Sequence, residues 1–357
     1  MAILTLSRAK DLLDRIRSVE TVVVGDLMLD RYISGAVDRV SPEAPVPIVR
    51  VEGQQENVGG AGNVAANISA IGAMCSVVGC VGDDAEGRIV YSALQRQGVD
   101  VSGVVTTPGR PTTVKTRVIA GHQQMVRFDL EDDSELDVEV AGQLIKGLQS
   151  SATDTDVIVI EDYNKGVLSH SVIDAAMRAS VEHGIPSVVD PKQRNFFSFS
   201  GATVFKPNAK ELGDALGACI YPDDPLWMKQ TREHLSCACL MVTLGSEGIA
   251  LDVEGAGHRR LFGASKMVYD GSGAGDTVTA VLATVMAAGG SPVEAADIAN
   301  HAAAVGVTKA GVATVSPEEI LEQIEAKVPT NPTENKCCLL YTSDAADEGL
   351  GVDLGGR

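Results

Sequence analysis

Aromatic and basic residues are scarce in this sequence. Of its 357 residues 4% are aromatic, with a single tryptophan, and 29 lysines and arginines stand against 48 aspartates and glutamates. The formal net charge at pH 7 is therefore −19. A protein that binds nucleic acid through the phosphates needs a basic surface, so this charge argues against a nucleic-acid partner. It does not exclude a small nucleotide, which backbone amides and a metal ion can hold locally.

Long apolar segments are missing too. The longest nearly apolar stretch, residues 278–288, is too short to cross a bilayer, which takes about 20 residues. Residues 1–17 mix apolar and charged side chains at helical spacing and lack the apolar block of a signal peptide. These two absences predict a cytoplasmic protein that does not bind a membrane.

Several signatures of catalysis and of metal binding are also absent. The seven cysteines include one CxC and one CC pair, but no second pair at the spacing that zinc requires, and nothing indicates a disulfide framework. None of the six histidines belongs to an HxxxH motif. The sequence has no GxSxG elbow, no lysine-containing Walker A motif and no GxGxxG after its first predicted strand. A zinc protein, a serine hydrolase, a P-loop kinase and a Rossmann dehydrogenase are therefore disfavoured.

What the sequence does contain is a regular alternation of short β-branched runs and helical segments. This alternation predicts an α/β fold with a mainly parallel sheet. Ligands of such sheets bind at the carboxyl ends of the strands. The predicted strands lie at residues 21–24, 77–81, 157–160, 187–189, 203–205 and 240–243, and the predicted helices include 64–71, 87–96, 171–183 and 225–235.

Two stretches interrupt the alternation. Residues 32–51 and 112–129 alternate apolar and polar side chains, and Gly121-His122 is a plausible turn in the second stretch. We predict antiparallel strands outside the main sheet. They are either a lid or dimer surface or an ordinary extension of the sheet edge, and the pattern alone does not choose between these.

The C-terminal part of the sequence changes character. Residues 310–315 are typical of a last strand, and residues 317–326 of a last helix with Ser316 as its N-cap. Residues 331–357 show no periodicity, and their segment CCLLYTSDAADE resembles a translated sequencing adapter. We expect this tail to be unstructured, we leave open whether it is native, and we set it aside for fold reasoning.

The strongest chemical motif is Asp270-Gly-Ser-Gly-Ala-Gly-Asp276, which directly precedes an apolar helix. Small residues allow backbone amides to approach a ligand closely, and the N-terminal end of the helix attracts negative charge. Such a site stabilises a phosphoryl group in transfer, and the carboxylate of Asp276 is placed to accept the proton of an attacking hydroxyl. The alternative is a tight strand-to-helix turn with Asp276 as N-cap.

Three further motifs are weaker when taken alone. Gly59-Gly-Ala-Gly-Asn63 leads into a helix, and Thr243-Leu-Gly-Ser-Glu-Gly248 follows a strand. Asn208 and Glu211 stand three residues apart at a predicted helix start, where they suit water-mediated magnesium binding or an ordinary capping box equally well. Gly25-Asp26-Leu-Met-Leu-Asp30 places two carboxylates near the ligand edge of the sheet.

Taken together and in this order, the motifs resemble the ribokinase/PfkB family of carbohydrate kinases. Residues 59–82 are similar to its first signature and residues 270–276 to its second, and the resemblance spans about residues 15–325. It implies a ribokinase-like three-layer α/β fold with a mainly parallel central sheet and a small β-sheet lid. One kinase domain would then cover residues 1–330, with its lid strands within residues 32–51 and 112–129.

The resemblance also implies roles for the residues at matching positions, with ATP and Mg²⁺ as cofactors. Asp276 would be the catalytic base, and Gly273, Ala274 and Gly275 would form the anion hole. The sugar would be held by Asp30, Gly60 and Asn63, the nucleotide by Thr243, Gly245, Gly248 and Asn300, and the magnesium ion by Asn208 and Glu211 through water.

Other residues resemble a narrower group, the bacterial D-glycero-β-D-manno-heptose 7-phosphate kinases. The similar segments are residues 39–48, 124–127, 162–166 and 190–192. Many members of this group continue into a cytidylyltransferase with an HxGH motif, which is absent here, so we expect a stand-alone kinase or a bifunctional enzyme cut short. Ser272 stands where threonine is usual, and Glu161 where a small residue is usual, which leaves the substrate more open than the activity.

The narrower resemblance implies phosphorylation of the heptose 7-phosphate at its anomeric hydroxyl, for lipopolysaccharide heptose synthesis. Alternatives are another sugar kinase of this fold, acting on a hexose phosphate or a nucleoside, and a non-catalytic nucleotide or sugar-phosphate sensor. A homodimer through the lid is expected, and dependence on a monovalent cation is left open. The candidates for holding the phosphate of the sugar are Arg39, Arg127, Lys165 and Lys192.

Overall fold

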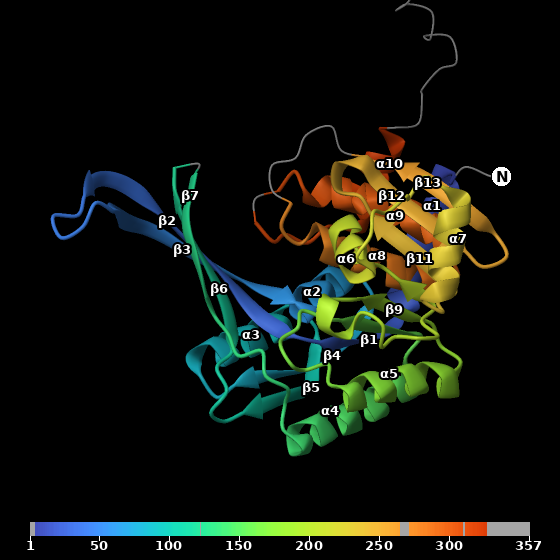
Figure 1. Ribbon diagram of the computed structural model, residues 1–357, viewed down its shortest axis with the longest axis horizontal. Coiled ribbons are helices and arrows are strands. Elements are labelled where there is room, and N and C mark those ends of the chain that lie inside the picture. The colour runs from blue at the N-terminus through green and yellow to red at the C-terminus, as the bar shows by residue number, and fades with distance from the viewer. Residues whose placement is uncertain (1–3, 122, 265–270, 310, 327–357) are drawn as a thin grey trace, which may run out of the picture.

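The computed structural model describes residues 4–121, 123–264, 271–309 and 311–326. Within them, one sheet has nine strands, all parallel from β11 through to β5, while β12 and β13 add an antiparallel edge (Figure 1). In spatial order the strands are β13 (Gly257–Phe262), β12 (Gly248–Val253), β11 (Cys239–Thr243), β10 (Val204–Phe205), β9 (Ser187–Asp190), β8 (Val157–Glu161), β1 (Glu20–Gly25), β4 (Met74–Gly82) and β5 (Asp100–Thr107).

Helices cover both faces of this sheet. Because side chains alternate along a strand, Val23 of β1 packs into one core while Val22 and Val24 pack into the other. The first core is closed by α1 (Leu6–Arg15), α2 (Ala61–Ala70), α3 (Ala85–Arg96), α8 (Ala274–Ala287), α9 (Pro292–Gly306) and α10 (Pro317–Glu325). The second is closed by α4 (Val138–Ser151), α5 (His170–His183), α6 (Ala209–Leu216) and α7 (Pro225–His234).

A second, four-stranded sheet projects from this body (Figure 1). The hairpins β2–β3 and β6–β7 are each antiparallel, and parallel pairing of β2 with β6 joins them. The two alternating stretches of the sequence fall in these strands, as predicted. We call this sheet the lid; its strands are β2 (Leu27–Val40), β3 (Pro47–Gly60), β6 (Thr113–Ala120) and β7 (Gln123–Leu130).

The predicted α/β fold class is confirmed, and the structure corrects several details. The helix predicted from residue 64 begins at Ala61, which places Asn63 inside its first turn. Residues 311–315 form no strand, and the edge strands β12 and β13 were not predicted. The last helix begins at Pro317 with Ser316 as its N-cap, as expected.

Two further points concern the ends of the fold. Within the described ranges no helix is both long enough and apolar enough to cross a membrane. His122, Asp270 and the C-terminal tail, for which we made predictions, lie outside the described residues. The boundary at residue 330 therefore stays a prediction.

Candidate active site

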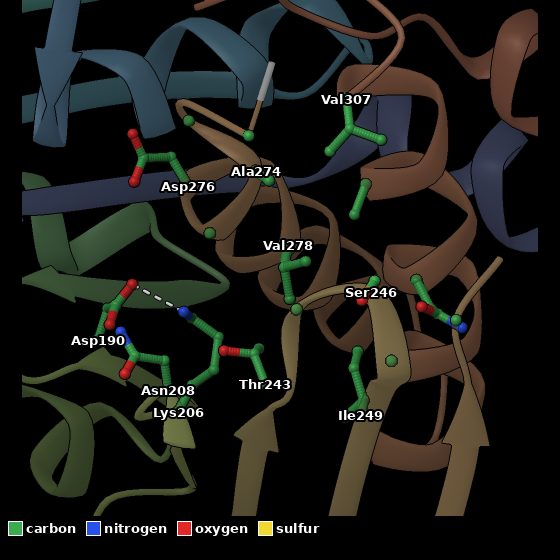
Figure 2. A pocket seen from close by; sticks show the side chains of 18 of the residues that line it. Asp190, Lys206, Asn208, Thr243, Ser246, Ile249, Ala274, Asp276, Val278 and Val307 are labelled. Atoms are coloured by element: carbon green, nitrogen blue, oxygen red, sulfur yellow. Dashed lines mark hydrogen bonds and ion pairs between the residues drawn. The ribbon is translucent and has the colours of Figure 1, made fainter. Parts of the chain in front are cut away.

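A pocket of about 410 Å³ opens at the carboxyl ends of the parallel strands. Figure 2 shows Asp190 and Thr243, which end β9 and β11, and Ala274 and Asp276 of α8 around it. This is the edge at which ligands of parallel sheets bind. The residues of the strongest sequence motif therefore lie where the fold places a ligand.

Helix α8 points its N-terminal end into the pocket. Gly273 is its N-cap and has a φ of 78°, in the left-handed region that side chains disfavour. A Cβ atom on Gly273 would lie 2.8 Å from Nδ2 of Asn63, so glycine is also required by space. The alternative of Asp276 as N-cap is wrong, because Asp276 lies in the first turn of the helix.

The carboxylate of Asp276 is buried and held from two sides. Its Oδ2 accepts a hydrogen bond of 2.6 Å from Nδ2 of Asn63, and its Oδ1 accepts one of 2.8 Å from the hydroxyl of Tyr163. Burial raises the pKa of Asp276 to about 6, although both hydrogen bonds act to lower it. The group is thus ionised at neutral pH with a pKa close to it, which suits a general base.

The hydroxyl of Tyr163 influences the pKa of Asp276. Burial and the neighbouring Asp276 hold the pKa of Tyr163 well above its ordinary value, so its hydroxyl stays protonated and donates to Asp276. We predicted no role for Tyr163 from the sequence, although it lies in residues 162–166, one of the segments that resemble the heptose 7-phosphate kinases. That likeness is the sequence feature that could have indicated a role.

Replacing Tyr163 with phenylalanine is expected to make the enzyme more sensitive to acid. The base must be ionised, so activity is lost as pH falls through about 6, and the pKa of Asp276 rises further when the donated hydrogen bond is removed. The ratio of kcat/KM at pH 6.5 to that at pH 8.5 should fall roughly 3- to 10-fold. Tyr91→Phe, at a partly exposed tyrosine, is the control. An unchanged pH profile would contradict the role of the hydroxyl.

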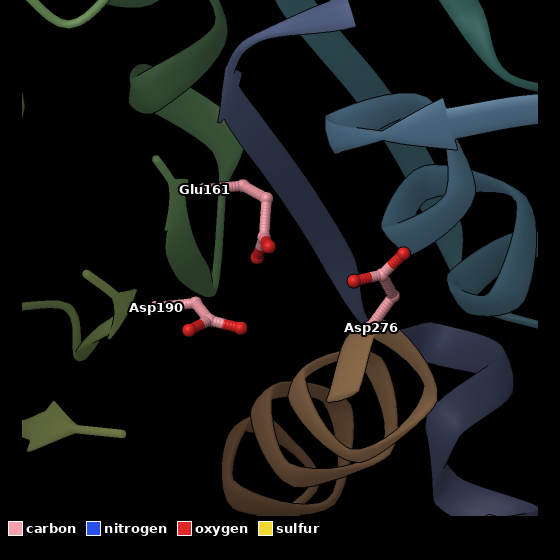
Figure 3. Close-up of side chains that lie close together, drawn as sticks. All are labelled: Glu161, Asp190 and Asp276. Atoms are coloured by element: carbon pink, nitrogen blue, oxygen red, sulfur yellow. The ribbon is translucent and has the colours of Figure 1, made fainter. Parts of the chain in front are cut away.

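Two more buried carboxylates lie beside Asp276. One oxygen each of Glu161, Asp190 and Asp276 lies within 4.8 Å of the others (Figure 3). Nζ of Lys206 binds Oδ2 of Asp190 at 2.7 Å, and burial of this pair is almost complete. Both oxygens of Glu161 lack a hydrogen-bond partner among the described residues, and burial with the two neighbouring acids raises its pKa well above the ordinary value. Lys206 is therefore the main neutralising charge of this cluster.

Asn208 and Glu211 form the capping box that was one of our two alternatives. Oδ1 of Asn208 accepts from the backbone N–H of Glu211 at 2.8 Å, and Oε2 of Glu211 accepts from the N–H of Asn208 at 2.8 Å. Oε1 of Glu211 accepts from Nζ of Lys192. Both residues also line the pocket. Each of these oxygens accepts one hydrogen bond, which leaves a lone pair for a water molecule of a magnesium shell.

The far end of the pocket suits a nucleotide. Thr243, Gly245, Gly248 and Asn300, which we predicted to contact one, all line it. Nδ2 of Asn300 donates to the carbonyl of Phe262 at 2.8 Å, which fixes the side chain against β13. Apolar side chains of Ile249, Ala303, Ala304 and Val307 line the same pocket and offer a surface for a planar base.

The predicted sugar residues lie at the root of the lid. Asp30 is buried and its Oδ1 accepts from Nη1 of Arg117 at 2.5 Å. Gly59 permits this position, because a Cβ atom there would lie 2.3 Å from Oδ2 of Asp30. Gly60 is the N-cap of α2, three residues before Asn63 in the first turn. Asp30, Gly60 and Asn63 are thus brought together between lid and body.

The four side chains predicted to bind the phosphate of the sugar lie in different surroundings. Lys192 lines the pocket, whereas Lys165 binds Glu131 at 3.0 Å and Arg127 binds Asp129 at 2.6 Å. Arg39 is exposed near the distal end of β2 and does not line the pocket. An extended strand rises about 3.3 Å per residue, so β2 carries Arg39 away from the pocket. In a single chain Arg39 therefore lies far from Asp276.

Asp26 is a structural residue, contrary to our expectation of two carboxylates at the ligand edge. It is fully buried, and its carboxylate accepts from the backbone N–H groups of Tyr163, Lys165 and Val167 at 2.8, 3.0 and 3.1 Å. Asp26 thereby fixes the loop that presents Tyr163. Contacts this remote in sequence left no local signal.

Comparison with protein families and with curated proteins shows the family to which this chain belongs. Residues 19–319 match the family described as pfkB family carbohydrate kinase, so the chain belongs to that family. The "Bifunctional protein HldE" of Pelobacter propionicus is 40% identical over 317 residues, 88% of this chain and 65% of the relative. That of Magnetococcus marinus is 42% identical over 305 residues, 84% of this chain and 62% of the relative. The chain thus spans less than two thirds of the length of these relatives.

Solved structures agree on the fold. Arabidopsis thaliana ribokinase complexed with ribose and ATP has a TM-score of 0.68 at 20% identity, covering 86% of this chain and 99% of its own. Escherichia coli phosphofructokinase-2 in complex with substrates and products has a TM-score of 0.72 at 18% identity, covering 87% and 99%. The fold is ribokinase-like, and the family to which the chain belongs is one of carbohydrate kinases.

Proposed function

We propose that the chain transfers the γ-phosphoryl group of ATP to the anomeric hydroxyl of D-glycero-β-D-manno-heptose 7-phosphate. The product would be the 1,7-bisphosphate, for lipopolysaccharide heptose synthesis. The observation that carries the proposal is the buried carboxylate of Asp276, held by Asn63 and Tyr163 in the first turn of α8. The likeness of residues 39–48, 124–127, 162–166 and 190–192 to heptose 7-phosphate kinases supports this acceptor.

Different residues of the chain have different roles in the transfer of the phosphoryl group. Asp276 accepts the proton of the anomeric hydroxyl while the oxygen of that hydroxyl bonds to the γ-phosphorus. The bond from this phosphorus to the bridging oxygen breaks, and ADP leaves with the electron pair. The amides of Gly273, Ala274 and Gly275 at the N-terminus of α8 stabilise the charge of the group in transfer. A magnesium ion, when bound, would neutralise phosphate charge, with Asn208 and Glu211 holding it through water.

The test is an ADP-release assay across a panel of acceptors. Heptose 7-phosphate, fructose 6-phosphate, ribose and adenosine are compared at equal concentration, with a blank without acceptor to subtract ATP hydrolysis. We expect heptose 7-phosphate to give the highest kcat/KM and a product with phosphate at the anomeric carbon. Equal rates with fructose 6-phosphate would contradict the proposed acceptor. ATP binding with no transfer to any acceptor would favour a sensor.

We also propose that the lid forms a homodimer. Val126, Phe128 and Leu130 alternate along the edge strand β7, so they share one face, and each is at least half exposed. Val37, Val40 and Val51 of the neighbouring hairpin are exposed as well. An apolar surface of this kind is typical of a contact between proteins.

Phe128→Asp is therefore expected to yield a monomer. A buried charge at the contact costs several kcal/mol unless it is paired, which exceeds what one apolar contact contributes. The measurement is the mass in solution by light scattering during size-exclusion chromatography. Phe197→Asp, at an exposed phenylalanine away from the lid, is the matched control. A dimer that persists in Phe128→Asp would place the contact elsewhere.

A further inference from the structure

Lys115 is a cation without a counter-ion at the junction of lid and body. It lies half-buried on β6, and its Nζ is 4.8 Å from the centroid of the Tyr163 ring. Its ammonium group forms no hydrogen bond or ion pair with any residue that the structure describes. Burial lowers the pKa of Lys115, with Arg127 and Lys165 acting in the same direction, although the nearby charges of Asp30 and Asp129 act to raise it. An ammonium in such surroundings is stabilised by an anion that comes from outside the chain.

The pairing of the lid strands explains why this charge is uncompensated. Lys115 stands opposite Asp30 on β2 and opposite Asp129 on β7, so the three side chains share one face. Both carboxylates are taken by arginines, since Asp30 accepts from Arg117 and Asp129 from Arg127. The acids beside Lys115 are thus already neutralised.

The other nearby lysines differ from Lys115 in this respect. Nζ of Lys165 binds Glu131 at 3.0 Å, and Nζ of Lys192 binds Glu211. Lys192 also lies 5.0 Å from the ring centroid of Tyr163 and lines the main pocket, which Lys115 does not. The two lysines over this ring therefore lie in different regions. Lys192 lies in the main pocket, and Lys115 lies on the lid beside the predicted sugar residue Asp30.

We propose that Lys115 binds the anionic group of the acceptor, a phosphate several bonds away from the hydroxyl that reacts. The inference rests on the proposed function. The hydroxyl of Tyr163 contacts Asp276, and its ring face contacts Lys115, so the ring separates the two ends of the acceptor. An acceptor that reaches both must carry its charge remote from its reacting hydroxyl. Lys115 thereby selects phosphorylated sugars over free sugars.

The test is the preference for a phosphorylated acceptor. The ratio of kcat/KM for heptose 7-phosphate to that for the unphosphorylated heptose is measured for the wild type, Lys115→Met and Lys115→Arg. A hydrogen bond to a charged group is worth about 1.5–3 kcal/mol, so Lys115→Met should lower this ratio roughly 10- to 100-fold. Lys115→Arg should recover most of it, and the KM for ATP should not change. Lys146→Met, at an exposed lysine of α4, is the control.

Two outcomes would overturn the inference while leaving the proposed function intact. The first is wild-type kcat/KM with both acceptors in Lys115→Met. The second is an equal loss of kcat/KM with both acceptors, which also leaves the ratio unchanged and indicates general damage to the lid. Calorimetric titration with heptose 7-phosphate in the absence of ATP measures binding of the acceptor directly. It therefore tests the inference even if no phosphoryl transfer is detected. Binding to the wild type that is lost in Lys115→Met supports the subsite even then. Equal binding to both proteins, or binding to neither, contradicts it.

Discussion

Asp276→Asn is expected to lower kcat for phosphoryl transfer roughly 100- to 10,000-fold, because the amide cannot accept the proton of the attacking hydroxyl. The substitution preserves the shape of the side chain in its buried position in the first turn of α8. It does disturb one hydrogen bond, since Asn63 and Tyr163 both donate to the carboxylate and an amide group has a single accepting oxygen. The effect should therefore fall on kcat far more than on the affinity for ATP.

Two measurements separate loss of the base from loss of the fold. Steady-state ADP release gives kcat, and calorimetric titration with a non-hydrolysable ATP analogue gives nucleotide affinity. Asp174→Asn, at an exposed position of α5, is the matched control and should keep wild-type values of both. A kcat close to that of the wild type in Asp276→Asn would show that another group takes the proton.

Lys206→Met is expected to destabilise the protein by about 3–5 kcal/mol, because it removes one partner of a buried ion pair and leaves the other unpaired. Lys206 is 2% exposed and Asp190 5%, and their charged atoms lie 2.7 Å apart. Burial acts to lower the pKa of Lys206, but Asp190 and Glu161 outweigh it and raise that pKa. Without the ammonium, Asp190 would face Glu161 and Asp276 with no cation bound to it.

Urea unfolding followed by circular dichroism measures this loss of stability. Lys210→Met is the matched control, since Lys210 forms an exposed i,i+4 pair with Asp214 and such pairs contribute little. Adding Asp190→Asn to Lys206→Met should recover part of the stability, because it removes the orphaned charge. Equal stability of the two single variants would mean that water reaches the Lys206–Asp190 pair and screens it.

The local sequence carried much of the fold and part of the site. Short β-branched runs marked the parallel strands, because a strand buried on both faces must be apolar throughout. Ser316 and the run that follows it marked α10, since a cap is decided by neighbouring residues. The edge strand β13 was not predicted, because His258, Arg259 and Arg260 make it polar.

The starts of α2 and α8 were placed three residues late for a related reason. After its first alanine each segment continues with glycine and then asparagine or aspartate, residues of low helix propensity that locally favour a turn. The consequence matters for the site, because Asn63 and Asp276 each lie inside a first helical turn. Packing of α2 against α8 then brings Nδ2 of Asn63 to the carboxylate of Asp276.

By itself the sequence determined the class of fold and the motif that ends at Asp276. These are properties of local pattern, in which period, caps and glycine loops are set by neighbouring residues. Only the tertiary structure decided that Tyr163 binds Asp276, that Asp26 holds the loop of Tyr163, and that Lys206 neutralises Asp190. It also decided that the ammonium group of Lys115 has no ion-pair partner among the residues that the structure describes. Burial and pairing of charge depend on segments more than a hundred residues apart, such as those of Asp26 and Tyr163, which meet only when the sheet assembles.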